Sequence, residues 1–152
     1  MSSAENGAGI ATRGPWGDGV ERLAAAVEVA AAGERDWEGR LSAGLAAGLE
    51  LLAADPPLAH RLLVEVLATT RPARLEYERS LLGLAEAIRS PTVSAQTARL
   101  FAGGLASHVS GRVLAGEAEH LPEDHDLLLR YLLAPTAAAT SSPAERRSAE
   151  RA

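Results

Sequence analysis

Leucines recur at intervals of three and four residues through most of the chain, and this spacing limits what the chain can fold into. Between residues 36 and 54, the side chains that would share one face of an α-helix are Trp37, Leu41, Leu45, Leu49 and Leu52. The other apolar residues favour the same structure, because 32 alanines and 23 leucines stand against 8 valines and 2 isoleucines. The sequence therefore predicts an all-α fold.

Glycines, prolines and capping residues mark where the predicted helices begin and end. These boundary residues are Gly33, Asp36, Asp55, Pro56, Thr70, Pro72, Ser90, Pro91, Gly116, Pro122 and Pro135. About six helices are predicted, over residues 20–32, 36–54, 56 to before 70, from there to about 90, from 92 or 95 to 115, and 122–134.

One domain, residues 20–135, is expected to hold all six helices. Residues 1–19 and 136–152 are rich in small and polar residues without helical periodicity, so we expect a disordered leader and a disordered tail. Inward-facing side chains are expected in the third helix at Leu58, Leu62, Leu63, Val66 and Leu67, and in the fourth at Leu75, Leu81, Leu82, Leu84, Ala85 and Ile88.

The number and distribution of charged residues argue against nucleic-acid binding. Lysine is absent, and 15 arginines are scattered among 20 acidic residues, which gives a formal net charge of -5. A surface that binds phosphates should be basic and clustered, so we expect no direct nucleic-acid binding. The chain has no cysteine, no signal-peptide pattern and no apolar run long enough to span a bilayer. A cytoplasmic protein that does not enter membranes is the expectation.

Neither a metal site nor a catalytic site is predicted. The four histidines, His60, His108, His120 and His125, do not repeat at helical metal-site spacing, and the acidic run at 117–126 is interpreted as a solvated loop and an acidic helix start. No nucleophile has an identifiable base, so we expect no enzyme, no metal and no cofactor. His108 lies among apolar neighbours; it could contact a ligand or a partner subunit, but a hydrogen-bonded core or interface histidine is the favoured interpretation.

The fifth and sixth predicted helices suggest a second subunit. Gly103, Ser107 and Gly111 lie four residues apart on one face, which would let another helix approach closely. The sixth helix has almost no polar face and should be buried all round. The predicted dimer interface is formed by Gly103, Ser107, Gly111, Leu128, Tyr131 and Leu132.

Four segments resemble the C-terminal regulatory domain of TetR/AcrR-type transcriptional regulators: DWEGRL at 36–41, DPPLAHRLLVEV at 55–66, FAGGLASHVSGRVLAGE at 101–117 and LPEDHDLLLRYLLAP at 121–135. The likeness covers about residues 20–135 and rests on helix order, helix lengths and these strings. It implies a bundle whose last two helices join those of a second subunit in a four-helix dimer interface. It also implies a pocket for a small hydrophobic effector that shifts the dimer between two conformations and changes DNA affinity.

Such a pocket would be lined by Trp37, Leu41, Leu45, Leu62, Val66, Tyr77, Leu81, Phe101, Leu105 and His108. The family's N-terminal DNA-binding domain has no counterpart in residues 1–19. Three expectations follow: the chain forms a homodimer, it pairs with a full-length regulator, or its sequence is one part of a longer repressor. The alternative from another class is a helical interaction module without a ligand, and an internal cavity would distinguish the two.

Overall fold

A computed structural model describes residues 15–68 and 70–140 of the chain. Every regular element in this part of the chain is a helix, which confirms the predicted all-α fold. The elements are α1 (Pro15–Ala32), α2 (Trp37–Ala54), α3 (Pro56–His60), the π-helical turn η1 (Arg61–Glu65), α4 (Val66–Ala68), α5 (Arg71–Ile88), α6 (Ala95–Leu114), the 3₁₀ segment η2 (Ala118–Asp124) and α7 (His125–Thr140). Among the described helices, none has the length and apolar character needed to cross a membrane.

Capping side chains explain several helix starts. Asp36 accepts a hydrogen bond of 2.7 Å from the Gly39 backbone N–H, which confirms it as the cap of α2. Asp55 accepts from the Leu58 N–H at 3.1 Å and so caps α3. The cap of α6 is Ser94 rather than the expected Ser90, whose buried hydroxyl instead lies 3.0 Å from the Thr92 hydroxyl.

Two predicted boundaries at the ends of the domain are wrong. The first helix begins at Pro15, so residues 15–19 of the expected leader are helical; proline is well tolerated at a first helical position because its missing N–H would be unpaired there. The last helix continues through Pro135 to Thr140. Proline removes one helical hydrogen bond there, but the helix can continue because the fixed φ of proline is a helical value. Residues 1–14 and 141–152 of the predicted leader and tail lie outside the described residues.

The predicted sixth helix also starts later than expected. Residues 118–124 form η2, and α7 begins at His125 instead of Pro122. Ala118 and Leu121, three residues apart, are both buried, and the 3₁₀ turn aligns residues with this spacing on one side. The tighter turn therefore lets a short segment between α6 and α7 contribute two side chains to the core.

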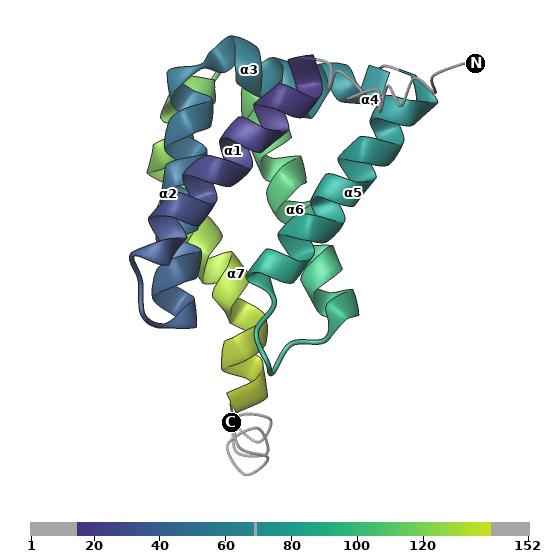
Figure 1. Cartoon of the computed structure of the whole chain (residues 1–152). Coiled ribbons are helices and arrows are strands. Elements are labelled where there is room, and N and C mark those ends of the chain that lie inside the picture. The colour runs from purple at the N-terminus through teal and green to yellow at the C-terminus, as the bar shows by residue number, and fades with distance from the viewer. Residues whose placement is uncertain (1–14, 69, 141–152) are drawn as a thin grey trace, which may run out of the picture.

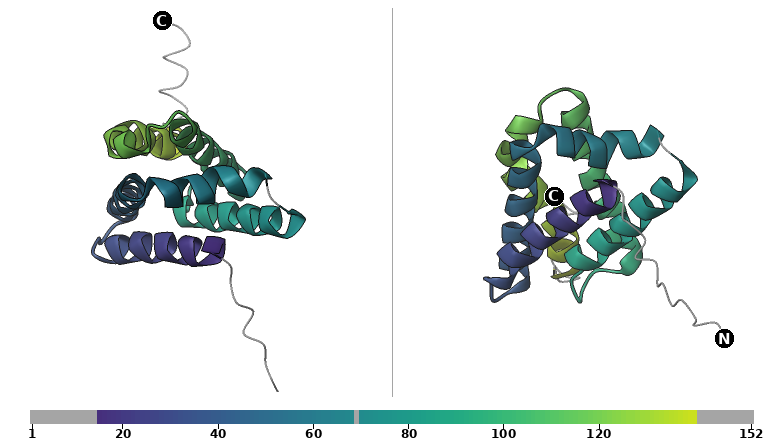
Figure 2. Two further views of the ribbon diagram at one scale, coloured as in Figure 1. Left: turned by 90° about the horizontal axis from the view of Figure 1, so that it is seen from above. Right: turned by 45° about the horizontal axis from the view of Figure 1, so that its top comes forward.

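The helices form three layers. In the view from above in Figure 2, α1 is one outer layer, α2 to α5 are the middle layer, and α6 with α7 is the other outer layer. Packing follows this order, since α1 lies on α2, α2 on η2 and α7, and α5 on α6 (Figure 1). The outward sides of α6 and α7 are consequently one outer face of the molecule.

The core lies between these layers and is built mainly from leucine and alanine. Leu121 and Val66 are its largest fully buried side chains. In α2, a Cβ added to Gly44 would lie only 3.0 Å from Val27 of α1. The close approach of a neighbouring helix therefore accounts for a small residue in the middle of α2.

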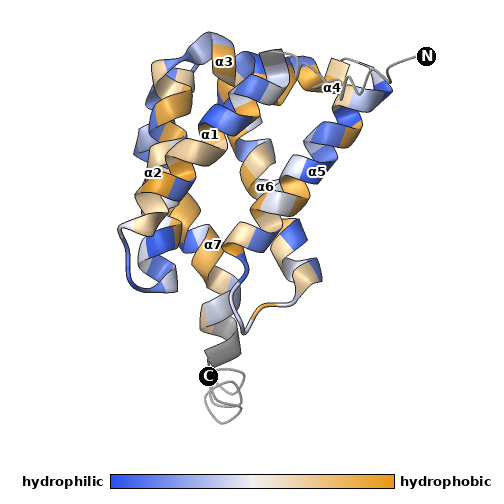
Figure 3. Ribbon diagram, viewed as in Figure 1, coloured by the Kyte–Doolittle hydropathy of each residue, from blue (hydrophilic) through white to orange (hydrophobic). Residues whose placement is uncertain are grey.

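The helix α5 contributes less to the core than its leucines predict. Only Ala85 and Ile88 of this helix are buried. Figure 3 shows α5 as more hydrophilic than α2. Three leucines expected to face inward are instead exposed, Leu75 by 44% and Leu82 by 45% on α5, and Leu67 by 53% on α4. These helices lie at the edge of the middle layer, where fewer neighbours cover them.

Candidate functional site

The residues predicted to line an effector pocket are mostly packed inside the protein. Leu41, Leu62, Val66 and Leu105 are buried, while Trp37, Leu45 and Phe101 are half-buried against the core. Tyr77 and Leu81 lie half-buried on α5, and burial raises the pKa of the Tyr77 phenol. The structure therefore brings six of the ten predicted residues together in one core cluster, and Val66 is buried outside that cluster.

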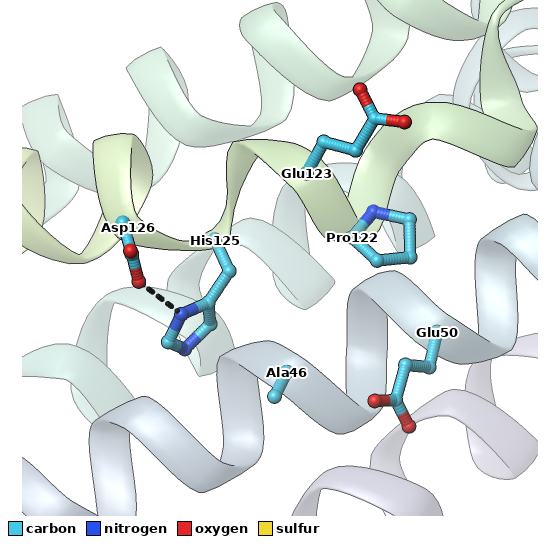
Figure 4. Close-up of a pocket in the computed structure, with 6 residues that line it drawn as sticks. All are labelled: Ala46, Glu50, Pro122, Glu123, His125 and Asp126. Atoms are coloured by element: carbon cyan, nitrogen blue, oxygen red, sulfur yellow. Dashed lines mark hydrogen bonds and ion pairs between the residues drawn. The ribbon is translucent and has the colours of Figure 1, made fainter.

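The surface of the described chain carries two open hollows. The first, of about 330 Å³, lies between α2 and the start of α7 and is lined by Ala46, Glu50, Pro122, Glu123, His125 and Asp126 (Figure 4). The second, of about 320 Å³, is lined by Glu78, Leu81, Leu82 and Arg99. Leu81 alone among the predicted pocket residues lines either hollow. The effector pocket stays a prediction, since nine of its ten residues line neither of these hollows.

The outward side of α6 carries a strip of small residues between two exposed leucines. Leu100 is 69% exposed and Leu114 is 66% exposed. Between them, a Cβ added to Gly103 or Gly111 would meet nothing within 4 Å. Ser107, at the middle of the strip, is also exposed. We call these five residues the α6 strip; the opposite side of the helix faces the core through Ala98, Ala102, Leu105, Val109 and Val113.

The α7 residues of the predicted interface divide between the core and the surface. Leu128 and Leu132 are 3% and 4% exposed and pack in the core of their own chain, so their assignment to a dimer interface is wrong. Nor is α7 buried all round in the chain, because Leu127 is 50% and Tyr131 is 37% exposed. Only one side of α7 therefore packs against the core of this chain, and the other side is exposed.

An aromatic pair connects the exposed side of α7 to α6. The rings of Phe101 and Tyr131 stack with centroids 4.5 Å apart and an interplanar angle of 27°. A Cβ on Gly104 would overlap the Tyr131 hydroxyl, so the Tyr131 side chain packs directly over this glycine and would have to move for a larger residue. Sequence spacing placed Gly103 in the predicted strip, but it did not predict that Gly104 would face α7.

His108 belongs to an ion-pair cluster at the joint between α6 and α7. Its Nε2 donates to Asp124 Oδ2 at 2.9 Å, and the same oxygen lies 3.0 Å from Arg112 Nε. Arg112 also donates to Glu117 at 2.5 Å. The His108 hydrogen bond holds the pKa of Asp124 below its usual value, and Arg112 acts in the same direction. This histidine is hydrogen-bonded within its own chain, as the favoured interpretation predicted, and it lines neither of the two hollows.

The other two histidines of this joint also contact carboxylates. His120 Nδ1 lies 2.9 Å from Glu123 and its Nε2 lies 3.6 Å from Glu119. His125 Nδ1 donates to Asp126 at 3.0 Å. The sequence showed the acidic run at 117–126 but not that it pairs with histidines, because the pairing with His108 depends on how η2 returns against α6. No group of three or more His, Asp or Glu residues in the described chain could hold a metal ion.

Comparison of the chain with protein-family models, with curated proteins and with solved structures gave no match.

Proposed function

We propose that this chain is a self-associating helical domain, in which the outer face of α6 and α7 pairs with the same face of a second copy. The observation that carries the proposal is the order of the α6 strip. Leu100, Gly103, Ser107, Gly111 and Leu114 stand at -7, -4, 0, +4 and +7 relative to Ser107. The same residue types therefore occur at the same spacing in both directions from Ser107.

An antiparallel contact with twofold symmetry matches this order. With the axis at Ser107, Leu100 of one copy meets Leu114 of the other, and Gly103 meets Gly111. Small residues near the centre let the two backbones approach, while the leucines cover each other at both ends. Arg99, eight residues from the centre, would lie beside the C-terminal end of the partner helix, where the helix dipole is negative.

The energy of the strip alone is too small for a stable pair, which is why α7 belongs to the proposed surface. Burying the exposed parts of four leucines contributes roughly 4–8 kcal/mol, while association costs an estimated 4–15 kcal/mol. Leu127 and Tyr131 extend the apolar surface along α7, next to the strip. A four-helix contact that uses both helices of each copy supplies the additional buried area.

The resemblance to TetR-type regulatory domains supports the same assignment, because in that family the last two helices form the dimer interface. Of the two properties that the resemblance implies, self-association is the one that the exposed surface of α6 and α7 supports. Effector binding would require an opening within the packed core described above. The proposal is therefore a dimerisation domain of this general type, and the alternative partner is a full-length regulator that presents a similar pair of helices.

Single cysteines test the geometry, since the chain has none of its own. We expect Ser107→Cys to form a disulfide-linked dimer under mild oxidation, because residues on the twofold axis come within the 4.4–6.8 Å Cα separation that a disulfide needs. Gly103→Cys alone should not cross-link, because its two copies would lie about 12 Å apart along the helix axis. An equal mixture of Gly103→Cys and Gly111→Cys should cross-link.

The matched control is Gly83→Cys, an exposed glycine on α5 with nothing within 4 Å of an added Cβ. Non-reducing electrophoresis measures the yield of linked dimer. Equal yields from Ser107→Cys and Gly83→Cys would show random collision and overturn the proposed surface. Linking of Gly103→Cys alone in preference to the mixture would indicate a parallel pair and overturn the antiparallel arrangement.

A further inference from the structure

Three side chains form a hydrogen-bonded chain between α2 and the start of α7: Ser42, His125 and Asp126. The Ser42 hydroxyl lies 3.2 Å from His125 Nε2, and His125 Nδ1 lies 3.0 Å from Asp126 Oδ1. Figure 4 shows the second contact, at the edge of the hollow between the two helices. Ser42 and His125 are 83 residues apart in the chain, so no local sequence pattern indicates that they pair.

The contact with Asp126 decides which nitrogen of the neutral His125 ring carries the hydrogen. An ionised carboxylate only accepts hydrogen bonds, so Nδ1 carries the hydrogen and Nε2 keeps its lone pair. That lone pair accepts the hydrogen of the Ser42 hydroxyl. The Ser42 carbonyl oxygen also lies 3.2 Å from Nε2, and it can accept a hydrogen bond from this nitrogen once the ring is protonated. His125 is therefore placed to act as a general base for Ser42.

Two other serines of the described helices show the contrast. Ser80 donates to the Glu76 carbonyl oxygen at 3.0 Å, and Ser110 donates to the Leu63 carbonyl oxygen at 3.5 Å. A serine hydroxyl is a weak nucleophile unless an adjacent base takes its proton, and a backbone carbonyl oxygen is not such a base. Of these three serines, Ser42 alone contacts an imidazole.

The hollow beside this hydrogen-bonded chain is large enough for a small molecule. Its volume is about 330 Å³, and it begins at Ala46, one helical turn from Ser42 on the same side of α2. His125 lines the hollow and also contacts the half-buried Ser42, so it connects the two. The lining also includes three carboxylates, those of Glu50, Glu123 and Asp126. This charge favours a positively charged molecule over an anionic one.

We propose that Ser42 and His125 form a hydrolytic site for small carboxylic esters whose alcohol part carries a positive charge. Ser42 Oγ bonds to the acyl carbon, His125 Nε2 takes the hydroxyl proton, and the bond from the acyl carbon to the alcohol oxygen breaks. The alcohol leaves with that proton, and the acyl group stays on Ser42. Water then bonds to the acyl carbon, passes one proton through His125 to Ser42 Oγ, and releases the carboxylic acid. Asp126 is a positioning residue, because it holds the His125 ring.

The surroundings of the site set the expected rate. General-base catalysis typically contributes about 10²–10⁴-fold. The residues that line the hollow include no arginine that could stabilise the oxyanion of the tetrahedral intermediate. Asp126 is 88% exposed, so water competes with His125 for its carboxylate. We therefore expect slow turnover, and the reactivity of the Ser42 hydroxyl is the more direct quantity to measure.

Covalent labelling tests the nucleophile. A fluorophosphonate forms an O–P bond with an activated serine and loses fluoride, and mass spectrometry of the peptides locates the adduct. We expect the adduct on Ser42, with Ser80 and Ser110 of the same sample as internal controls that stay unlabelled. His125→Gln should slow the labelling of Ser42 about a hundredfold. The matched control His60→Gln should not, because this exposed histidine lies at the end of α3, outside the site.

A conservative rescue tests the role of Asp126. Asp126→Asn should slow the labelling of Ser42, because an amide orients the His125 ring less strongly than a carboxylate does. Asp126→Glu should recover part of the rate, since it restores the charge. Equal labelling rates in the wild type and Asp126→Asn would overturn the positioning role.

Hydrolysis of two matched esters tests the substrate class. Acetylcholine and 3,3-dimethylbutyl acetate have the same shape and differ in one positive charge, and a pH-stat measures the acid that each releases. We expect kcat/KM to be about fivefold higher for acetylcholine, as for one charge pair in contact in water. The double variant Glu50→Gln and Glu123→Gln should reduce this preference. Ser42→Ala should abolish the hydrolysis, and it should fold because alanine is a strong helix former.

Four results would overturn the proposal. Labelling spread evenly over Ser42, Ser80 and Ser110 would show no activated serine, and this result needs no variant. Labelling of Ser42 that is unchanged in a folded His125→Gln would remove the base. Hydrolysis that persists in Ser42→Ala would assign attack to the imidazole alone. Equal kcat/KM for the two esters would refute the substrate class.

This site is independent of the proposed self-association. Sedimentation of the same samples separates the two. A monomer that is labelled at Ser42 refutes only the proposed function, whereas a dimer that is not labelled refutes only the hydrolytic site.

Discussion

Adding side chains to the α6 strip should disrupt pairing without disrupting the fold. Gly103 and Gly111 have no neighbour within 4 Å of an added Cβ, so the double substitution Gly103→Gln and Gly111→Gln meets no obstacle inside the chain. Each replacement of a helical glycine by glutamine should stabilise the helix by about 0.5 kcal/mol. The free energy of unfolding of the isolated chain should therefore rise by roughly 1 kcal/mol.

The effect on the pair should have the opposite sign and be larger. Two glutamines at the proposed closest approach would hold the helices apart and prevent the exposed leucines at either end from covering each other. Loss of even the lower figure of about 4 kcal/mol for four leucines weakens association about a thousandfold. Glutamine is chosen instead of leucine because an apolar side chain on an exposed face would itself promote association.

Sedimentation velocity measures the outcome directly. The wild-type chain of 15.8 kDa should sediment as a species of twice that mass, and the double variant as a single chain. Gly83→Gln is the control, because it makes the same kind of change on an exposed position of α5. A double variant that dimerises as tightly as the wild type would refute the assignment of the strip. A double variant that is less helical or unfolds more easily as a monomer would refute the reasoning that the strip is free in the single chain.

Three further predictions concern the core, the joint and the surface of α7. Leu121→Ala should lower the free energy of unfolding by about 2–5 kcal/mol in urea titrations, because this side chain is fully buried. Leu127→Ala should lower it by less than about 1 kcal/mol, since half of that side chain is exposed, but should weaken the dimer in sedimentation equilibrium. Asp124→Asn should lower the Tm at neutral pH, because it weakens the contacts to His108 and Arg112. The difference from wild type should shrink as the pH falls through the lowered pKa of Asp124, and a difference that persists in strong acid would contradict an electrostatic role.

Local patterns were sufficient to predict the helices and several of their ends. Asp36 caps α2 and Asp55 caps α3, each through a backbone N–H group three residues further along the chain. A contact over so few residues can be predicted from the local sequence alone. The extension of α1 back to Pro15 was missed, because residues 15–19 carry two glycines and gain their helical state from packing against the rest of the fold. Gly19, for example, is buried where an added Cβ would lie 2.7 Å from Leu58.

The surfaces could be predicted only in part. Spacing alone placed Gly103, Ser107 and Gly111 on one face of α6, and the structure leaves that face uncovered within the chain. Spacing could not say which side of α7 the core would use, since nearly every position of that helix is apolar. The core takes Leu128 and Leu132, which leaves Leu127 and Tyr131 outside.

The sequence by itself determined that the chain is helical and where most of its helices start, because helix propensity, leucine spacing and capping act over a few neighbouring residues. The tertiary structure decided which apolar residues became core, and it joined the histidines of α6, η2 and α7 to the acidic run. His108 and Asp124 are sixteen residues apart in the chain and 2.9 Å apart in the fold. That contact depends on the path of η2 back against α6, which is set by packing between helices and not by any local pattern.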